Sequence, residues 1–327
     1  MENYSGSDFK PGDEGERVDV SSPSTGPGST PDLKAVMKLY VVVFLLLLVF
    51  GSIAQGLHFE IGMIITQWVI ILIPALWFLR RYRVDRFSFV RFKTLNWHFI
   101  PVIILLSASF WLLNMAVAAG LVTGLMEIGY EPVMVLEPPQ TLQHYLVYLF
   151  ILSVSAGICE EVMFRGALMP ALEKYGIVPA IVFSSFLFAL FHVSFLNLFS
   201  TFMLGIVMAV VVIKTGSLLG GILYHMLNNF YAATYLYLAG QEETAAEISL
   251  QDLWALLPLV IMAGAGAYAG LRLLQSRSNV KPLLENRESG WLPRGWFNWL
   301  MVVSIIFFLI LAMLELAIGF GWLGELF

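Results

Sequence analysis

The chain has 327 residues, of which 59% are hydrophobic and only 13% are charged. Because soluble globular domains carry about 25% charged residues, this composition excludes a soluble domain and predicts an integral, multi-pass membrane protein. The formal net charge of −5 gives no indication of a nucleic-acid partner. The single cysteine, Cys159, excludes an intramolecular disulfide and a cysteine-based metal cluster, and we expect it to be a small buried residue.

The chain begins with a polar segment. Residues 1–34 are rich in Gly, Ser, Pro and acidic residues and contain almost no large aliphatic ones. Such a segment cannot bury enough apolar surface to fold. We therefore expect a disordered cytoplasmic tail over residues 1–34, without a cleavable signal peptide.

Nine long apolar stretches follow, and most reach the length of about 17–25 residues that a membrane helix needs. They cover residues 36–54, 61–79, 99–121, 143–164, 177–195, 198–214, 217–238, 253–273 and 297–321. Because only two residues, Leu196 and Asn197, separate the fifth stretch from the sixth, the predicted fold class is an all-α polytopic membrane protein with eight or nine transmembrane helices and an intramembrane polar cavity. This helical domain is expected over 35–321, with 322–327 as a short C-terminal end.

Lysine and arginine fall on one side of the predicted nine-helix alternation. All 18 of them lie in the tail or in every second loop, whereas the alternate loops contain acidic residues and no base. By the positive-inside rule, the N-terminus is cytoplasmic and the C-terminus lies outside. We expect a protein of a lipid bilayer, with the compact single chain favouring a prokaryotic plasma membrane.

Three short runs place polar or ionisable groups inside these apolar stretches. They are Glu160-Glu161-Val-Met-Phe-Arg165, Phe188-Ala-Leu-Phe-His192 and His225-Met-Leu-Asn-Asn229. A charge at the centre of a membrane helix costs about 2.5–3.5 kcal/mol, and such groups mark a functional site by default. Two carboxylates, two imidazoles, a guanidinium and a carboxamide are more typical of a hydrolytic site than of a transport path.

Helical spacing separates the two glutamates. Glu161 and Arg165 are four residues apart, so they share a helix face and can form an ion pair. Glu160 is rotated from that face by about 100°, which leaves one carboxylate uncommitted and a candidate for a general base. The alternative is that these charges only mark the cytoplasmic end of a span.

Each of the remaining polar residues could have either a catalytic or a structural role. His225 and Asn229 are four residues apart, and an imidazole and a carboxamide on one stripe suit hydrogen-bond donation to a developing oxyanion. Hydrogen bonding between helices is the alternative role, and an isolated His192 is more often a packing residue than a catalyst. Asn228 lies about 100° off the stripe and is not expected in the site.

In order and type, the three runs resemble the CPBP or Abi family, which contains the type II CAAX prenyl endopeptidases. The family pattern is E-E-x-x-x-R, then F-x-x-x-H, then H-x-x-x-N or H-x-x-x-D, and all three parts are complete here. The resemblance covers residues 160–229, inside a family core expected at about 143–238. The long tail and a ninth helix at 297–321 depart from the family's usual eight spans.

The resemblance implies an intramembrane endopeptidase of the glutamic type that hydrolyses peptide bonds of membrane-associated peptides or proteins, with no cofactor. Glu160, assisted by His192, would activate a water molecule. His225 and Asn229 would stabilise the tetrahedral oxyanion formed when that water attacks the scissile carbonyl.

Glu161 and Arg165 would support this site by holding the helix end and tuning its electrostatics. The three runs begin at different distances from their helix starts, so we expect the fifth helix to begin well outside the hydrocarbon, near Pro179, or to be strongly tilted. The site would be a cavity open to the cytoplasmic side, with His192 within about 10 Å of Glu160.

Two other functions fit the same residues. His192, His225 and Glu160 are the His/His/carboxylate set of a catalytic zinc site with an open position, although the chain contains no H-E-x-x-H. The second alternative is a non-catalytic immunity factor or scaffold, because related family members are linked to bacteriocin self-immunity. Nothing in the sequence identifies the substrate or a prenyl group on it.

Overall fold

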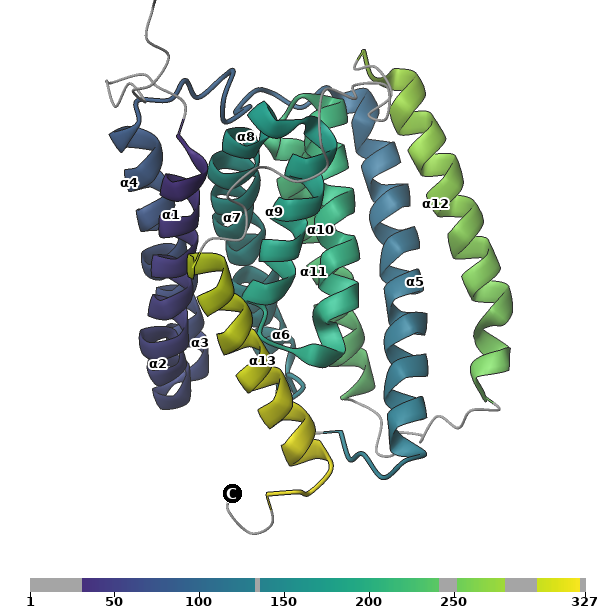
Figure 1. Cartoon of the computed structure of the whole chain (residues 1–327). Helices are drawn as coiled ribbons and strands as arrows, with labels where there is room; N and C mark the ends of the chain where they lie inside the picture. The colour runs from purple at the N-terminus through teal and green to yellow at the C-terminus, as the bar shows by residue number, and fades with distance from the viewer. Residues whose placement is uncertain (1–30, 133–135, 241–251, 280–298, 324–327) are drawn as a thin grey trace, which may run out of the picture.

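The computed structural model describes residues 31–132, 136–240, 252–279 and 299–323, and every regular element among them is helical (Figure 1). The helices are α1 (Leu33–Leu46), α2 (Ser52–Leu57), α3 (Phe59–Ile64), α4 (Ile73–Arg81), α5 (Ile100–Met126), α6 (Leu142–Tyr148), α7 (Ala156–Glu161), α8 (Met169–Leu172), α9 (Ile177–Phe191), α10 (Phe195–Thr215), α11 (Leu218–Ala239), α12 (Leu257–Arg277) and α13 (Trp299–Gly319). This confirms the predicted all-α class. Most of the predicted tail, residues 1–30, and the last residues, 324–327, lie outside the described ranges.

Several of these helices join end to end into longer rods through turns of different winding. The π-helical turns cover Leu47–Gly51, Ile65–Leu72, Leu149–Ser155 and Val162–Leu168, and the 3₁₀ turns cover Trp97–Phe99, Glu173–Tyr175 and Asp252–Leu256. The first rod contains α1 and α2, the second contains α3 and α4, and the longest contains α6, α7 and α8.

Seven rods or helices in the described part of the chain are long and apolar enough to cross a membrane, so the protein is an integral, multi-pass membrane protein. They are Leu33–Leu57, Phe59–Arg81, Trp97–Met126, Leu142–Tyr175, Phe195–Thr215, Leu253–Arg277 and Trp299–Gly319. Each of the nine predicted stretches contains a helix in the described residues, but the count of eight or nine spans is not confirmed. The 15 residues of α9 extend over only about 22 Å, against a hydrocarbon core of about 30 Å, and α11 contains the polar side chains of the third run.

The longest rod corrects one predicted boundary. The fourth stretch was expected to end near Arg165, because charged residues are common where a helix leaves the bilayer. Instead the rod continues to Tyr175, and Leu168 and Met169 beyond Arg165 are completely buried. Arg165 therefore lies inside the bundle, where its charge needs a partner.

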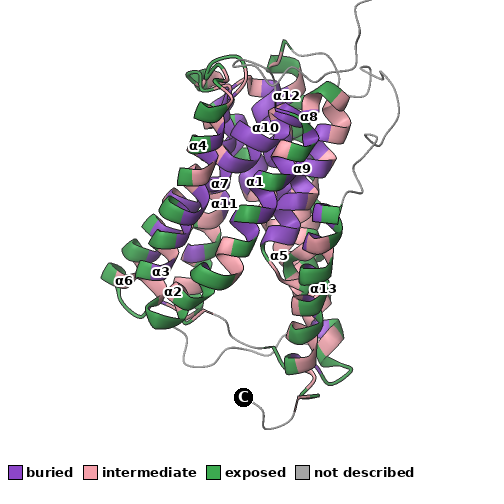
Figure 2. Ribbon diagram, turned by 60° about the vertical axis from the view of Figure 1, so that its left-hand side comes forward, coloured by how far each residue is buried: buried purple, intermediate pink, exposed green. Residues whose placement is uncertain are grey.

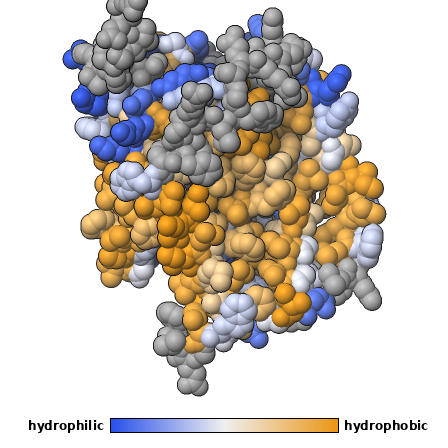
Figure 3. Space-filling model, in the orientation of Figure 1, coloured by the Kyte–Doolittle hydropathy of each residue, from blue (hydrophilic) through white to orange (hydrophobic). Residues whose placement is uncertain are grey.

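The basic helix ends meet at one end of the bundle. The backbone N–H of Leu218, at the start of α11, donates to the carbonyl of Arg91 at 2.8 Å. The hydroxyl of Ser278, just after α12, donates to the carbonyl of Lys214 in the last turn of α10 at 2.7 Å. Figure 3 shows hydrophilic residues gathered at this upper end, above a broad hydrophobic belt.

The opposite end of the bundle brings acidic residues together with the neighbouring loops. His144 Nε2 lies 3.0 Å from Glu60 Oε1, which joins the second rod to the start of α6. The N–H of Glu131 donates to the carbonyl of Gly319 at 2.7 Å, which ties the end of α13 to the loop after α5. The segregation of charge seen in the sequence is therefore also a segregation in space.

The most buried part of the molecule surrounds α7 and α9, which other helices enclose (Figures 1 and 2). Arg165, Tyr40 and Phe188 are among the largest side chains that are completely buried. The Tyr40 hydroxyl donates to the carbonyl of Leu187 at 3.1 Å, so α1 is bonded to α9 inside this core. The polar runs thus lie in a closely packed region rather than at the rim.

Two glycines allow the helices to approach closely beside the buried charges, as small residues do at membrane helix interfaces. A Cβ atom on Gly221 would lie 2.5 Å from Val212 Cγ2 and 2.8 Å from Glu161 Oε2. A Cβ atom on Gly205 would lie 2.9 Å from the Cβ of Ser185. Neither position has room for a side chain, so these contacts fix the distance of α11 and α10 from their neighbours.

Candidate active site

The two glutamates of the first run lie in α7, a six-residue segment between two π-helical turns. A π-helical turn changes the direction of the side chains that follow it and is frequent at functional sites. Glu160 and Glu161 are both buried but point to different partners. Their roles therefore separate, as the sequence predicts.

Glu161 and Arg165 form an ion pair inside the bundle. Arg165 Nη1 lies 2.6 Å from Glu161 Oε1, and both side chains are completely buried. Arg165 Nη2 donates to the carbonyl of Gly205 at 2.9 Å, and the guanidinium lies 4.5 Å from the centre of the Phe188 ring. These contacts compensate the buried cation and join the longest rod to α9 and α10.

Glu160 has one bonded and one unbonded oxygen. Gln67 Nε2, from the second rod, donates to Glu160 Oε1 at 2.8 Å. Glu160 Oε2 is buried and accepts no hydrogen bond from the described residues. It lies 4.0 Å from Nε2 of His192 and 4.0 Å from Nε2 of His225. The unbonded oxygen of the spare carboxylate therefore faces both imidazoles.

His192 ends α9, and its ring is turned by a bond to its own helix. Its Nδ1 lies 2.8 Å from the carbonyl oxygen of Phe188. Because a carbonyl only accepts hydrogen bonds, Nδ1 carries the proton. In the neutral ring, Nε2 is then an acceptor, and this nitrogen points toward Glu160. The His192 side chain is 31% exposed.

His225 lies between the two glutamates. Its Nδ1 is 3.3 Å from Glu161 Oε1, on the side opposite to the nitrogen that faces Glu160. The Phe188 ring stacks edge-on against both His192 and His225, with ring centres 4.6 and 5.8 Å apart. The phenylalanine of the second run thus packs both imidazoles and the Arg165 guanidinium.

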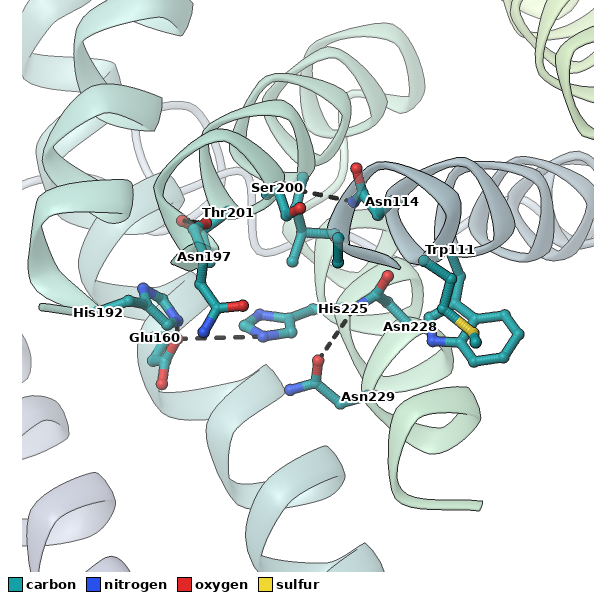
Figure 4. A pocket seen from close by; sticks show the side chains of 13 residues that line it. Trp111, Asn114, Glu160, His192, Asn197, Ser200, Thr201, His225, Asn228 and Asn229 are labelled. Atoms are coloured by element: carbon teal, nitrogen blue, oxygen red, sulfur yellow. Dashed lines mark hydrogen bonds and ion pairs between the residues drawn. The ribbon is translucent and has the colours of Figure 1, made fainter. Parts of the chain in front are cut away.

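The two asparagines of α11 are bonded to each other. Asn229 Nδ2 donates to the carbonyl of Leu152 at 2.7 Å, and Asn228 Nδ2 donates to Asn229 Oδ1 at 3.1 Å. Both line the same pocket as Glu160 (Figure 4). The expectation that Asn228 lies away from the site is wrong, because the pocket covers more of the helix surface than one stripe.

The pocket beside Glu160 has a volume of about 340 Å³. Its walls come from four segments: the middle of α5, the longest rod, the turn before α10 with the first half of α10, and the middle of α11. The lining residues are Trp111, Asn114, Met115, Ala118, Glu160, His192, Asn197, Ser200, Thr201, Leu204, His225, Asn228 and Asn229. Apart from the predicted residues, its polar members are amides and hydroxyls.

The pocket extends from Glu160 away from the basic end of the bundle. On α10 it is lined from Asn197 to Leu204, whereas the basic residue Lys214 is in the last turn. On α5 it is lined from Trp111 to Ala118, in the middle of that helix. The side on which the pocket opens is not given by these lining residues, so the predicted opening on the cytoplasmic side stays a prediction.

The depths of the three runs fit together because α9 begins farther out than α11. His192 follows the start of α9 by a rise of about 22 Å, and His225 follows the start of α11 by only about 10 Å. Both reach the same oxygen of Glu160. His192 is therefore well within the expected distance of Glu160, whereas the position of the start of α9 relative to the hydrocarbon stays a prediction.

In this conformation the carboxylate and imidazoles of the zinc alternative are spaced more widely than the donors around a bound zinc ion. Among the described residues, no group of three or more His, Cys, Asp or Glu side chains is arranged to hold a metal ion. Donor atoms of a tetrahedral zinc site lie about 3.3–3.5 Å apart, closer than the 4.0 Å between Glu160 Oε2 and each imidazole.

Gln67 and the far wall of the pocket were not identified from the sequence. Gln67 is 3% exposed, and Asn114 donates to the carbonyl of Ser200 at 3.4 Å. The sequence does show Gln67 as a lone carboxamide within an apolar stretch. Burying a carboxamide without a hydrogen-bond partner is unfavourable. The lone carboxamide therefore indicates burial against something polar but does not identify the partner.

Comparisons with curated proteins and with solved structures find no match to this chain. A third comparison finds one. Residues 142–231 match the family model described as Type II CAAX prenyl endopeptidase Rce1-like. The matched range begins at α6, ends within α11 and includes all three polar runs, which supports a peptidase. The chain therefore contains an Rce1-like domain at residues 142–231, which confirms the predicted resemblance to the type II CAAX prenyl endopeptidase, or CPBP, family in this region.

Proposed function

We propose that the protein is an intramembrane endopeptidase of the glutamic type, which cuts peptide bonds of membrane-associated peptides or proteins. One observation carries the proposal: the unbonded oxygen of Glu160 lies 4.0 Å from two imidazole nitrogens beside a pocket. A carboxylate held in this way has one free acceptor for a proton. The Rce1-like match supports the same reaction class.

The separation of Glu160 and His192 suits a shared water molecule. A water that donates both its hydrogens at about 2.8 Å places its two acceptors about 4.4 Å apart, close to the 4.0 Å between Glu160 Oε2 and His192 Nε2. The water oxygen attacks the scissile carbonyl carbon while one of its protons passes to Glu160. Glu160 then gives that proton to the leaving amine as the carbon–nitrogen bond breaks.

His225 and Asn229 are placed to stabilise the oxyanion of the tetrahedral intermediate. The bond from Asn229 Nδ2 to Leu152 uses one of its two hydrogens, so the other can donate to an oxyanion. His225 donates from Nε2 when it is protonated, and its Nδ1 faces the Glu161 carboxylate. Removing one such donor typically costs about 100- to 1,000-fold in rate.

Three residues outside the reaction centre hold it in place. Gln67 fixes one oxygen of Glu160 and thereby turns the other toward the imidazoles. The ion pair of Glu161 and Arg165 keeps α7 at a fixed distance from α10. These contacts supply the precise geometry that general-base catalysis needs.

The location of the pocket limits the substrate class. It lies within the membrane-spanning helices, and its lining combines apolar side chains with uncharged amides and hydroxyls. Such walls suit a peptide segment that is already in the bilayer, whose backbone groups need partners there. We place the basic end of the bundle in the cytoplasm, with the CAAX-type reaction of the matched family as the first activity to test.

The test uses the full chain in liposomes with a prenylated CAAX peptide and a set of unmodified transmembrane peptides, with cleavage read by mass spectrometry. Glu160→Gln keeps the shape of the side chain and removes the base, so we expect cleavage to fall by about 100- to 10,000-fold. The matched control is Glu127→Gln, which removes a carboxylate just after α5. Full cleavage by Glu160→Gln would overturn the proposal.

A further inference from the structure

The chain extends beyond its Rce1-like domain with α12 and α13, and α13 carries a single acidic residue, Glu315. Its carboxylate bonds the turn between α9 and α10 rather than facing the bilayer. Glu315 Oε1 accepts from the Ser194 hydroxyl at 2.8 Å, and Oε2 accepts from the backbone N–H of Phe195 at 2.5 Å. One carboxylate thus holds two donors at the start of α10.

We infer that Glu315 positions His192 and Asn197 by clamping this turn. The inference rests on the proposed function, in which His192 assists Glu160. It gives α13 a role in the site without contact with the substrate, so Glu315 is a positioning residue.

The turn needs support because its backbone is unfavourable. Val193, directly after His192, has a φ of +51°. A β-branched residue rarely adopts a positive φ, and such conformations persist only when surrounding contacts hold them. The first donor bonded by Glu315 is only one residue beyond Val193. Without that bond, the turn can relax and carry the His192 ring away from Glu160.

A second line of contacts runs from Glu315 into the pocket wall. Ser194 caps α10, accepting from the backbone N–H of Asn197 at 3.2 Å and from Asn197 Nδ2 at 3.1 Å. Asn197 lines the pocket with Glu160 and His192 (Figure 4). The carboxylate thus fixes the serine, and the serine fixes a side chain that lines the pocket beside His192.

The helix that carries Glu315 is itself held at both sides of this residue. Before it, Phe308 and Ala312 pack against Leu190 in the last turns of α9. After it, the carbonyl of Gly319 accepts from Glu131, and a Cβ on Gly319 would collide with the Tyr130 ring. Burial and the charge of Glu315 raise the pKa of Tyr130. Glu315 is therefore a fixed anchor rather than a loose surface charge.

Hydrogen exchange in the full chain tests the clamp without requiring a substrate. The variant is Glu315→Gln, in which an NH₂ group that cannot accept replaces one of the two oxygens bonded by Ser194 and Phe195. A charge-assisted hydrogen bond is worth a factor of about 10 to 100 in an opening equilibrium, so we expect exchange of residues 192–197 to rise by about that factor. Glu127→Gln is the control, and Glu315→Asp, which keeps the charge on a shorter side chain, should give an intermediate rise.

The ¹⁵N spectrum of labelled histidines gives a second readout. A general loss of stability would change the signals of all histidines, whereas loss of the clamp would change that of His192 alone. We expect Glu315→Gln to shift or broaden the signal assigned to His192 and to leave that of His98 unchanged. Where the wild type cleaves a peptide, kcat should fall by about ten-fold, with partial recovery in Glu315→Asp.

Exchange at 192–197 that matches the Glu127→Gln control would overturn the clamp while leaving the proposed function intact. A rise in exchange spread over the whole bundle would also overturn it, in favour of general destabilisation. A rise confined to the turn would support it, even if no tested peptide is cleaved by the wild type. The failure of one proposal is therefore distinguishable from the failure of the other.

Discussion

Gln67 and Glu160 are 93 positions apart in the chain and meet in a buried hydrogen bond of 2.8 Å. The bond leaves Glu160 with a single free oxygen, and that oxygen faces His192 and His225. The second rod, which contains none of the three polar runs, therefore contributes to the site. This relationship leads to the first prediction.

Replacing Gln67 by methionine keeps the length of the side chain and removes the donor. We expect kcat to fall by about ten-fold with little change in KM, since a lost buried hydrogen bond is worth about 0.5–1.5 kcal/mol and the carboxylate loses its orientation. Steady-state cleavage in liposomes measures both constants. Gln55→Met is the control, because Gln55 bonds Thr66 and not Glu160. Equal kcat values for Gln67→Met and the wild type would contradict the assignment.

Cells that express Glu160→Gln separate a peptidase from a non-catalytic scaffold. A scaffold depends on surfaces, which this isosteric change preserves, so its phenotype should remain. We expect the phenotype to disappear at equal protein level. The membrane peptides of these cells would then be compared with those of cells that express the wild type. Peptides that are cleaved only in cells with the wild type are the substrates. An unchanged phenotype would support the scaffold.

Glu161 and Arg165 should behave as one unit in stability. Each is completely buried, so Glu161→Gln or Arg165→Met leaves an uncompensated buried charge, which costs about 3–5 kcal/mol in the free energy of unfolding. The double variant should cost less than the sum of the two. Unfolding in mixed micelles measures the change in unfolding free energy for each single variant and for the double variant. Simple additivity would show that the pair is not coupled.

Gly221→Ala should disturb the site through packing alone. The added methyl would lie 2.5 Å from Val212 Cγ2 and 2.8 Å from Glu161 Oε2, so α11 must move. We expect a loss of about 1–3 kcal/mol in unfolding free energy and reduced cleavage. Gly264→Ala in α12 is the matched control, because nothing lies within 4 Å of its Cβ position. Equal effects of the two substitutions would contradict the close packing of α11.

A strong chelator should leave cleavage unchanged, because Glu160, His192 and His225 are spaced more widely than zinc ligands. The measurement is activity after dialysis against the chelator, together with the zinc content of the purified protein. Loss of activity that added zinc restores would decide for metal-dependent hydrolysis by the same three residues.

The helices and the residues of the site could be predicted because both have strong local signals. Long apolar runs strongly predict membrane helices. Charged groups within such helices are energetically unfavourable and therefore indicate a functional or structural role. Spacing by four residues also separated the paired Glu161 from the spare Glu160. The roles of these residues in catalysis remain predictions.

Other features depend on partners that are distant in the chain. The continuation of the longest rod past Arg165 depends on Gly205 and Phe188, which accept the charge inside the bundle. The role of Asn228 depends on the breadth of the pocket. In the sequence, Gln67 and Glu315 are each an isolated polar residue in an apolar stretch. Their hydrogen-bond partners come from other parts of the chain, so no local pattern identifies them.

The wider winding on both sides of α7 makes the site sensitive to chain length. A π-helical turn arises when one extra residue is accommodated in an α-helix, so deleting one residue from Leu149–Ser155 would restore regular winding. The part of the rod below would then turn by about 100° relative to Glu160. Tyr145 would be carried away from its 2.8 Å contact with Thr234. A one-codon deletion would thus change the direction of Glu160 relative to α6 while the three polar runs keep their sequences.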